Sequence, residues 1–335
     1  MEYRLLGRTG VKVSVLCLGC MMFGGRTTPE DSATIIDTAI DAGINFLDTA
    51  NVYSRGRSEE VTGEALKRNG KRGRIVLATK VHGTMADDDP NMEGNSRRHI
   101  IQQAEASLRR LQTDYIDLYQ IHRPQSDIPI DETLRALDDL IRAGKVRYAG
   151  TSTYAAWQLV DSFWLSKELG LNRFVCEQPP YNLLDRRIER ELVPMARTYG
   201  MGIIPWSPLA GGLLTGKYNR KSPPPENTRF ADADKNPFLQ RRWTQSAFDI
   251  IEGIEPIAKA KGVSMSQFSL AWCAQQPGVT SPIIGPRTLD QLKDNLKALD
   301  VKLTDEDRAA VDKVSVPGRV YAPFYEADFG PHQYR

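Results

Sequence analysis

The sequence predicts an α/β fold, a single (β/α)8 TIM barrel, and two observations carry this prediction. Eight short apolar runs alternate with amphipathic stretches along the 335 residues, which is the order of a barrel in which every strand is followed by a helix. The first run leads into Cys-Met-Met-Phe-Gly-Gly, whereas a doubly wound sheet, the competing architecture, usually has a Gly-x-Gly-x-x-Gly turn there.

The chain begins with a segment that stands outside the repeat. Residues 1–14 hold Gly7, Thr9 and Gly10 between short apolar runs and predict a β-hairpin before the barrel. The barrel is expected over 15–300. Its eight strands are expected in the apolar runs at 15–19, 45–50, 75–80, 116–122, 146–151, 174–178, 202–206 and 280–285.

Helices are expected between these runs. In residues 31–42 the apolar side chains recur with helical spacing. Ser58 is placed as the N-cap of the next helix, with Glu59 and Glu60 in its first turn. The other amphipathic stretches are 98–111, 132–142, 153–169, 188–199, 244–261, 264–275 and 288–299.

Two further segments depart from the repeat inside what is expected to be one domain, 1–335. Residues 215–243 are long and polar, and a loop of this length inside a barrel is usually a lid or a mobile segment. Residues 301–335 are expected to form a C-terminal helix and a tail. The aromatic part of this tail, residues 320–325, is expected to fold over the barrel mouth.

Composition excludes several classes of function. The net charge is +2 with acids and bases interleaved, so no basic nucleic-acid surface is expected. No apolar run approaches the roughly 20 residues of a membrane span. The cysteines are few and scattered, which predicts no metal site and favours a reducing, cytoplasmic setting: Cys17, Cys20, Cys176 and Cys273. An oligomer is possible.

Ionisable residues follow three successive strand-like runs. Asp48 and Tyr53 follow the second run, Lys80 ends the third and His122 ends the fourth. All strand ends of one kind share a face of a barrel, so these four side chains are expected to meet. A free phenol has a pKa of roughly 10, and a nearby ammonium lowers it. Each residue alone has an ordinary structural explanation, but together they predict a proton-transfer site.

The chain closely resembles the aldo-keto reductase family over nearly its whole length. Many members have glycine after the tyrosine, where this chain has Ser54. The motifs that carry the resemblance are Asn45-Phe46-Leu47-Asp48-Thr49-Ala50 with Tyr53 downstream, Thr79-Lys80, Gln120-Ile121-His122-Arg123-Pro124, Gly150-Thr151-Ser152, Glu177-Gln178-Pro179-Pro180-Tyr181-Asn182, Pro205-Trp206-Ser207-Pro208-Leu209-Ala210-Gly211-Gly212 and Ile284-Gly285-Pro286-Arg287.

The resemblance implies an NAD(P)H-dependent carbonyl reductase without metal or flavin. Tyr53 would protonate the carbonyl oxygen as hydride reaches the carbon. Lys80 would lower the pKa of Tyr53, and Asp48 would hold Lys80 by an ion pair. His122 would donate a hydrogen bond to the carbonyl oxygen and stabilise its developing charge.

The resemblance also implies cofactor contacts. Trp206 would stack on the nicotinamide, while Ser152 and Gln178 would hydrogen-bond its carboxamide. Arg287 precedes a helix start at Thr288, which suits a phosphate monoester and predicts a preference for NADPH. The other implied contacts are Cys20, Met21, Asp48, Ser207, Leu209, Gly211, Lys217, Arg229, Gly285, Gln291 and Asn295.

The substrate is expected to be a small carbonyl compound: an aldehyde, a ketone or a keto-sugar. Met22, Phe23, His82, Phe324 and Tyr325 are positioned to line its pocket, although core packing explains each equally well. Relatives in this family also serve as potassium-channel β subunits. Some of those subunits have an extended segment ahead of the barrel; none is expected from this sequence, which weakens the channel-subunit interpretation without excluding it. Oxidation of an alcohol by the same residues is a third possibility.

Overall fold

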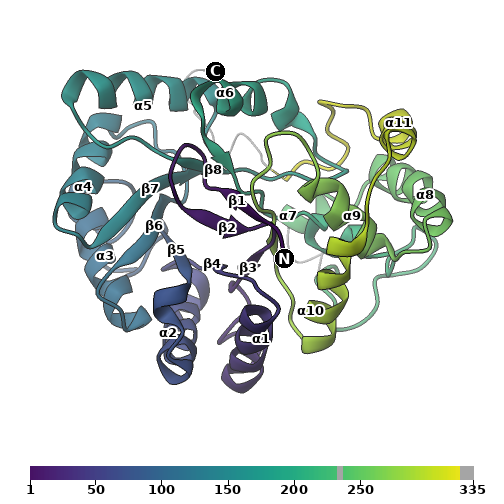
Figure 1. Ribbon diagram of the computed structural model, residues 1–335, viewed down its shortest axis with the longest axis horizontal. Helices are drawn as coiled ribbons and strands as arrows, with labels where there is room; N and C mark the ends of the chain where they lie inside the picture. Colours follow the sequence, from purple (N-terminus) through teal and green to yellow (C-terminus); the bar gives the residue numbers. More distant parts are fainter. Residues whose placement is uncertain (232–236, 325–335) are drawn as a thin grey trace.

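Eight parallel strands form one sheet in the computed structural model, which describes residues 1–231 and 237–324 (Figure 1). The order β10-β3-β4-β5-β6-β7-β8-β9 follows the chain except for β10, which pairs with β3. The predicted barrel is confirmed. Its strands are β3 (Cys17–Gly19), β4 (Phe46–Asp48), β5 (Val76–Val81), β6 (Ile116–Ile121), β7 (Val146–Ser152), β8 (Cys176–Gln178), β9 (Gly202–Ile203) and β10 (Ile283–Ile284).

The ring closes between its last two strands through backbone hydrogen bonds. The Thr280 N–H donates to the Ile203 carbonyl at 2.7 Å, and the Ile283 N–H donates to the Pro205 carbonyl at 2.8 Å. All eight strands therefore contribute their C-terminal ends to one face, which is where barrel enzymes build their sites.

The predicted N-terminal hairpin is also present. Strands β1 (Tyr3–Leu5) and β2 (Lys12–Ser14) pair antiparallel and cross the centre of the ring in Figure 1. Leu6 and Val13 from this hairpin pack with interior side chains such as Phe46 and Leu118 in a core inside the ring. Burying side chains of this size stabilises a fold by about 1.5–3 kcal/mol each, so the hairpin closes one end of a filled barrel.

Helices surround the sheet and bury their apolar faces against it in a second, larger core. Six of them have side-chain oxygens as N-caps, from Thr28, Ser96, Thr244, Ser264, Thr288 and Thr304. The helices are α1 (Pro29–Asp41), α2 (Arg57–Asn69), α3 (Arg97–Leu111), α4 (Ile130–Arg142), α5 (Ala156–Leu169), α6 (Leu192–Tyr199), α7 (Pro237–Gln240), α8 (Gln245–Ala260), α9 (Met265–Ala274), α10 (Leu289–Leu296) and α11 (Asp305–Val314).

One predicted cap is wrong. Helix α2 begins at Arg57 with Gly56 as its N-cap, so Ser58 lies inside the first turn. The Ser58 hydroxyl donates instead to the Cys20 carbonyl at 2.7 Å, and it lies 2.8 Å from the Thr49 hydroxyl. Ser58 therefore joins α2 to the loops after β3 and β4.

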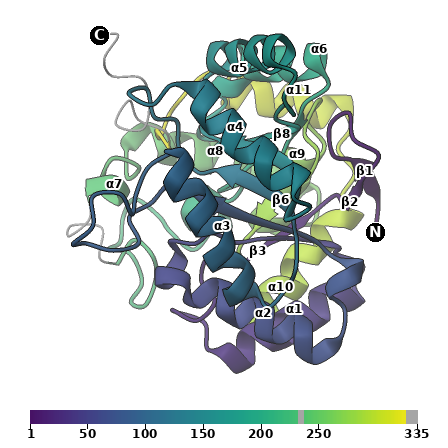
Figure 2. The same cartoon turned by 90° about the vertical axis from the view of Figure 1, so that its left-hand side faces the viewer.

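The other two segments outside the repeat, the long connection after β9 and the C-terminal tail, lie at the end of the barrel opposite the hairpin. Figure 2 shows α7, from the predicted 215–243 loop, on the far side of the molecule from β1 and β2. The tail returns to the same end, where the Phe324 N–H donates to Asp185 Oδ2 at 3.1 Å. Tyr325 lies outside the described residues.

The described chain has no helix that is both long and apolar enough to cross a bilayer. All four cysteines are buried with free thiols.

Candidate active site

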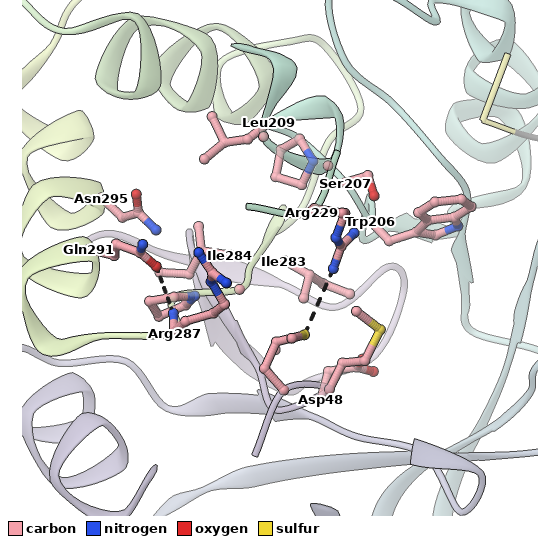
Figure 3. Close-up of a pocket in the computed structure, with 18 of the residues that line it drawn as sticks. Asp48, Trp206, Ser207, Leu209, Arg229, Ile283, Ile284, Arg287, Gln291 and Asn295 are labelled. Carbon is pink, nitrogen blue, oxygen red and sulfur yellow. Dashed lines mark hydrogen bonds between the residues drawn. The ribbon is translucent and has the colours of Figure 1, made fainter. Parts of the chain in front are cut away.

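A cavity of about 700 Å³ opens at the C-terminal ends of the strands. Asp48 ends β4, Ser152 ends β7 and Gln178 ends β8, and all three line the cavity. In Figure 3, Trp206 and Asp48 lie toward one end, while Arg287, Gln291 and Asn295 lie at the other. The cavity is therefore elongated, with the predicted catalytic and phosphate-binding residues at opposite ends.

The catalytic end is built on a buried ion pair. Lys80 Nζ lies 2.5 Å from Asp48 Oδ1, and the two side chains are 0% and 4% exposed. Burial opposes the Lys80 charge, but the Asp48 carboxylate and the Tyr53 oxygen outweigh it and raise the Lys80 pKa. Lys80 therefore stays cationic in the barrel interior.

Two amides hold the other oxygen of Asp48. Gln120 Nε2 donates to Asp48 Oδ2 at 3.0 Å, and Gln178 Nε2 donates to the same oxygen at 2.9 Å. Sequence reasoning did not assign Gln120 a role. The available signal was a polar residue two positions before His122, where the period of a strand places both on one face.

Tyr53 meets this network at its hydroxyl. The loop after β4 turns through a short helix, Tyr53–Gly56, and brings the Tyr53 oxygen to 3.3 Å from Lys80 Nζ. Lys80 also donates to the Thr49 carbonyl at 2.7 Å, so its ammonium is fixed from several sides. Ser54 and Arg55 adopt left-handed backbone angles, with φ of 49° and 51°.

His122 stands edge-on to Tyr53, with ring centroids 5.6 Å apart and an interplanar angle of 82°. Burial, together with the positive charges of Arg123 and Lys80, holds the pKa of His122 well below its usual range. The imidazole is therefore neutral near pH 7 and carries one N–H donor. Tyr53, His122 and Trp206 all line the cavity.

The next part of the wall suits a flat aromatic amide. Trp206 follows β9, and Phe324 packs edge-on against it with centroids 6.3 Å apart. The Ser152 hydroxyl donates to the Gln178 carbonyl at 2.9 Å. These polar groups beside an indole match the chemistry of a nicotinamide carboxamide.

Beyond Trp206 the backbone forms a cradle of small residues. Gly211 and Gly212 have φ of 66° and 107°, a region that favours glycine. A Cβ at Gly211 would lie 3.6 Å from the Arg229 guanidinium, and one at Gly212 would lie 3.3 Å from Lys217 Nζ. Two cations therefore cover this turn, which fits the pyrophosphate of a dinucleotide.

The end of the cavity away from Trp206 carries Arg287, which was predicted with Lys217 and Arg229 to bind the cofactor phosphates. Arg287 precedes α10, whose N-cap Thr288 accepts a hydrogen bond from the Gln291 N–H at 3.3 Å. The Gln291 side chain accepts from the Arg287 N–H at 2.8 Å (Figure 3). Asn295 lines the cavity one turn later. A guanidinium at a helix N-terminus fits a phosphate monoester, so the residues present fit NADPH.

Most of the predicted cofactor residues line this cavity, but Cys20 does not. Its side chain is fully buried, and its N–H donates to the Asp48 carbonyl at 2.8 Å, so Cys20 supports the wall from behind. The residues that do line it are Met21, Asp48, Ser152, Gln178, Trp206, Ser207, Leu209, Gly211, Lys217, Arg229, Gly285, Arg287, Gln291 and Asn295.

The expected substrate residues are only partly found in the cavity wall. Met22 lines it, whereas Phe23 is fully buried in the outer core because the loop folds back between Phe23 and Thr27. His82 instead pairs with Asn95 at 2.9 Å. Phe324 is fully buried behind Trp206. Arg26, Arg123 and Arg242 line the cavity and were not assigned a role from sequence.

Comparison with known proteins agrees with this geometry. The aldo/keto reductase family model matches residues 15–316. A probable voltage-gated potassium channel subunit beta from Oryza sativa subsp. japonica is 39% identical over 94% of this chain and 95% of its own. An oxidoreductase, YrpG, from Bacillus subtilis is 41% identical over 91% and 93%.

A versiconal hemiacetal acetate reductase from Aspergillus parasiticus is 37% identical over 96% of this chain and 99% of its own. Similarity of this extent spans the whole barrel and both ends of the cavity. The chain therefore belongs to the aldo/keto reductase family.

Proposed function

We propose that this protein reduces an aldehyde, ketone or keto-sugar to the alcohol with NADPH, and that Tyr53 is the general acid. One observation carries the proposal: the Tyr53 hydroxyl lies 3.3 Å from the buried Lys80 ammonium. A cation at this distance favours the phenolate that remains after a proton leaves Tyr53.

The protein's own residues divide the work around the carbonyl oxygen. Tyr53 gives its proton to that oxygen, and the ammonium of Lys80 stabilises the charge left on the phenol. His122, held neutral by burial, donates a hydrogen bond that orients the same oxygen. Asp48 keeps Lys80 charged and fixed in position. Bound NADPH would supply the hydride.

The preference for NADPH rests on Arg287. Its position before α10 supports recognition of the adenosine 2′-phosphate, because the helix N-terminus and the guanidinium both favour an anion there. Lys217 and Arg229 over the glycine turn would hold the pyrophosphate, which NADH shares.

The test is Tyr53→Phe, which removes one oxygen and keeps the ring. Turnover of a small aldehyde should fall by about 10²–10⁴-fold, the usual contribution of a general acid. NADPH binding, followed by fluorescence titration, should persist.

Tyr115→Phe is a matched control, because the Tyr115 ring lies outside the cavity, beneath Arg72 and Arg147. Full activity in Tyr53→Phe would refute the role of the phenol.

A second candidate is an NADPH-loaded regulatory subunit of a potassium channel. It is favoured by the name of the rice relative, which aligns over 95% of its length. Stable copurification with a membrane channel and no multiple turnover on a carbonyl library would favour this role. Rapid turnover favours the enzyme. The same assay run with NADP⁺ and alcohols tests physiological oxidation of a sugar or secondary alcohol.

A further inference from the structure

We propose that Arg26 joins Lys217 and Arg229, the two cations over the glycine turn, and acts with Arg229 on the pyrophosphate. The inference rests on the proposed function, because it assumes a nicotinamide dinucleotide in the cavity. It adds a residue from the loop after β3, residues 20–27, to the cations of the later loops. Arg26 lines the cavity, as Arg229 and Arg287 do.

The loop that carries Arg26 is fixed at both ends. At its start the Cys20 N–H donates to the Asp48 carbonyl at 2.8 Å. At its end the Thr27 hydroxyl donates to the Arg287 carbonyl at 3.2 Å. The loop therefore runs from the catalytic network to the phosphate end along one wall of the cavity, and Arg26 lies near the phosphate end.

Arg229 reaches this loop from the opposite wall. Arg229 Nη2 lies 3.8 Å from the Met22 sulfur, and a thioether is a weak acceptor for a guanidinium. Arg287 Nη1 lies 3.4 Å from the Asn227 carbonyl, so the segment that carries Arg229 also rests on Arg287. The two walls meet across the space where the pyrophosphate would lie.

The meeting brings like charges together. Burial, then the positive charge of Arg26 and more weakly that of Arg287, lowers the pKa of Arg229. Arg26 is exposed and makes no hydrogen bond or ion pair with any described residue. An anion between Arg26 and Arg229 would remove this repulsion and add charge-assisted hydrogen bonds.

The pyrophosphate is the anion that this position favours. Arg229 covers Gly211 in the glycine turn, whereas Arg287 lies at the start of α10. Arg229 also contacts Met22, which lies on the same loop as Arg26, and both arginines line the cavity. Arg26 should therefore contribute to NADPH and NADH binding alike, and Arg287 to NADPH alone.

The experiment is a fluorescence titration of NADPH and NADH against the full-length protein and single variants. Arg26→Gln should raise both Kd values by the same factor, about fivefold to tenfold for a lost charge-assisted contact. Arg26→Lys should recover part of the loss. Arg287→Gln should raise only the NADPH Kd.

Arg74→Gln is the matched control, since Arg74 is exposed near the start of β5, at the other end of the barrel from the cavity. Unchanged binding in Arg26→Gln would overturn the inference, as would a loss confined to NADPH. A wild-type protein that binds neither cofactor would overturn the proposed function itself.

Discussion

The two ends of the cavity are built in opposite ways. At the catalytic end, Asp48, Lys80 and Gln120 are fully or almost fully buried, and hydrogen bonds among protein groups hold Asp48 and Lys80. At the phosphate end, the contacts among the described residues are few: the Arg229 guanidinium touches a methionine sulfur, and the Arg287 guanidinium touches a backbone carbonyl at 3.4 Å. The first end is complete before any ligand arrives, while the second has cations that need an anion.

The difference follows from which elements carry the residues. Lys80 lies within β5 and Asp48 ends β4, and strands hold side chains in place for proton transfer. Arg229 lies on the long connection after β9, and loops of this kind can move to admit a long cofactor. Rigidity where the chemistry occurs and mobility where the cofactor enters is the arrangement we infer.

Replacing the buried lysine should break the catalytic end. Lys80→Met leaves the Asp48 carboxylate buried without its ion pair, which should cost about 3–5 kcal/mol of unfolding free energy. Urea denaturation followed by circular dichroism measures this change. Turnover should also fall, because Tyr53 loses its cation.

The double variant Asp48→Asn/Lys80→Met separates the two effects. It removes both charges, so it should recover part of the stability and none of the turnover. If the Lys80→Met protein were as stable as the wild type, the ion pair between Asp48 and Lys80 would not be what stabilises the catalytic end.

Salt should weaken the phosphate end of the cavity and leave the catalytic end almost unchanged. Raising KCl from about 0.05 M to about 0.5 M screens exposed charges, so the KM for NADPH should rise several-fold. At saturating NADPH, kcat should stay nearly constant, because Lys80 and Asp48 are shielded from solvent. A kcat that falls as steeply with salt as the affinity for NADPH would contradict this difference between the two ends of the cavity.

The catalytic end was the more predictable from sequence. Each of Asp48, Lys80 and His122 lies at the end of an apolar run, and barrel geometry brings such ends together. The role of Gln120 was not predicted because it depends on strand register: Gln120 lies beside Lys80 in the β5–β6 pairing. Strand periodicity shows the face of a residue but not its neighbour across the sheet.

The phosphate end and the loops were harder to predict. Cys20 and Phe23 were expected at the cavity, but the loop after β3 folds back and buries both. Ser58 has the chemistry of an N-cap, yet Gly56 takes that position and the Ser58 hydroxyl bridges two loops. These outcomes depend on loop paths, which no local pattern of residues specifies.

Among the described residues, one buried acid near the catalytic end has no ion pair like the one that Asp48 makes with Lys80. Glu177 is fully buried and accepts hydrogen bonds from the Thr151 hydroxyl at 2.5 Å and the Tyr154 N–H at 3.1 Å. Burial raises its pKa from 4.5 to about 8. The folded protein therefore keeps a proton that the unfolded chain loses, so the contribution of Glu177 to stability declines as pH rises from 4.5 to 8.

Glu177→Gln should flatten this decline. The informative window lies between about pH 6.5 and 8, because His99 and His122 have lowered pKa values and destabilise the fold only below about 6.5. Tm measured across this window should fall with pH in the wild type and change less in the variant. Equal slopes of Tm against pH in the two proteins would show that ionisation of Glu177 does not destabilise the fold.

The smallest effect is expected where the chain departs from its family. Ser54 follows Tyr53 with a φ of 49°, a conformation that favours glycine. Ser54→Gly should relieve roughly 1 kcal/mol of backbone strain and lose part of that gain to the greater flexibility of the unfolded chain. We expect a net stabilisation of about 0–1 kcal/mol.

Turnover tells whether this strain serves the site. If Lys80 and the ring of His122 alone position the phenol, Ser54→Gly should keep kcat within about twofold, which corresponds to roughly 0.4 kcal/mol. A large loss of kcat in a more stable variant would mean that the strained turn holds Tyr53 in place. The catalytic end would then depend on a loop as the phosphate end does, and the contrast between the two would narrow.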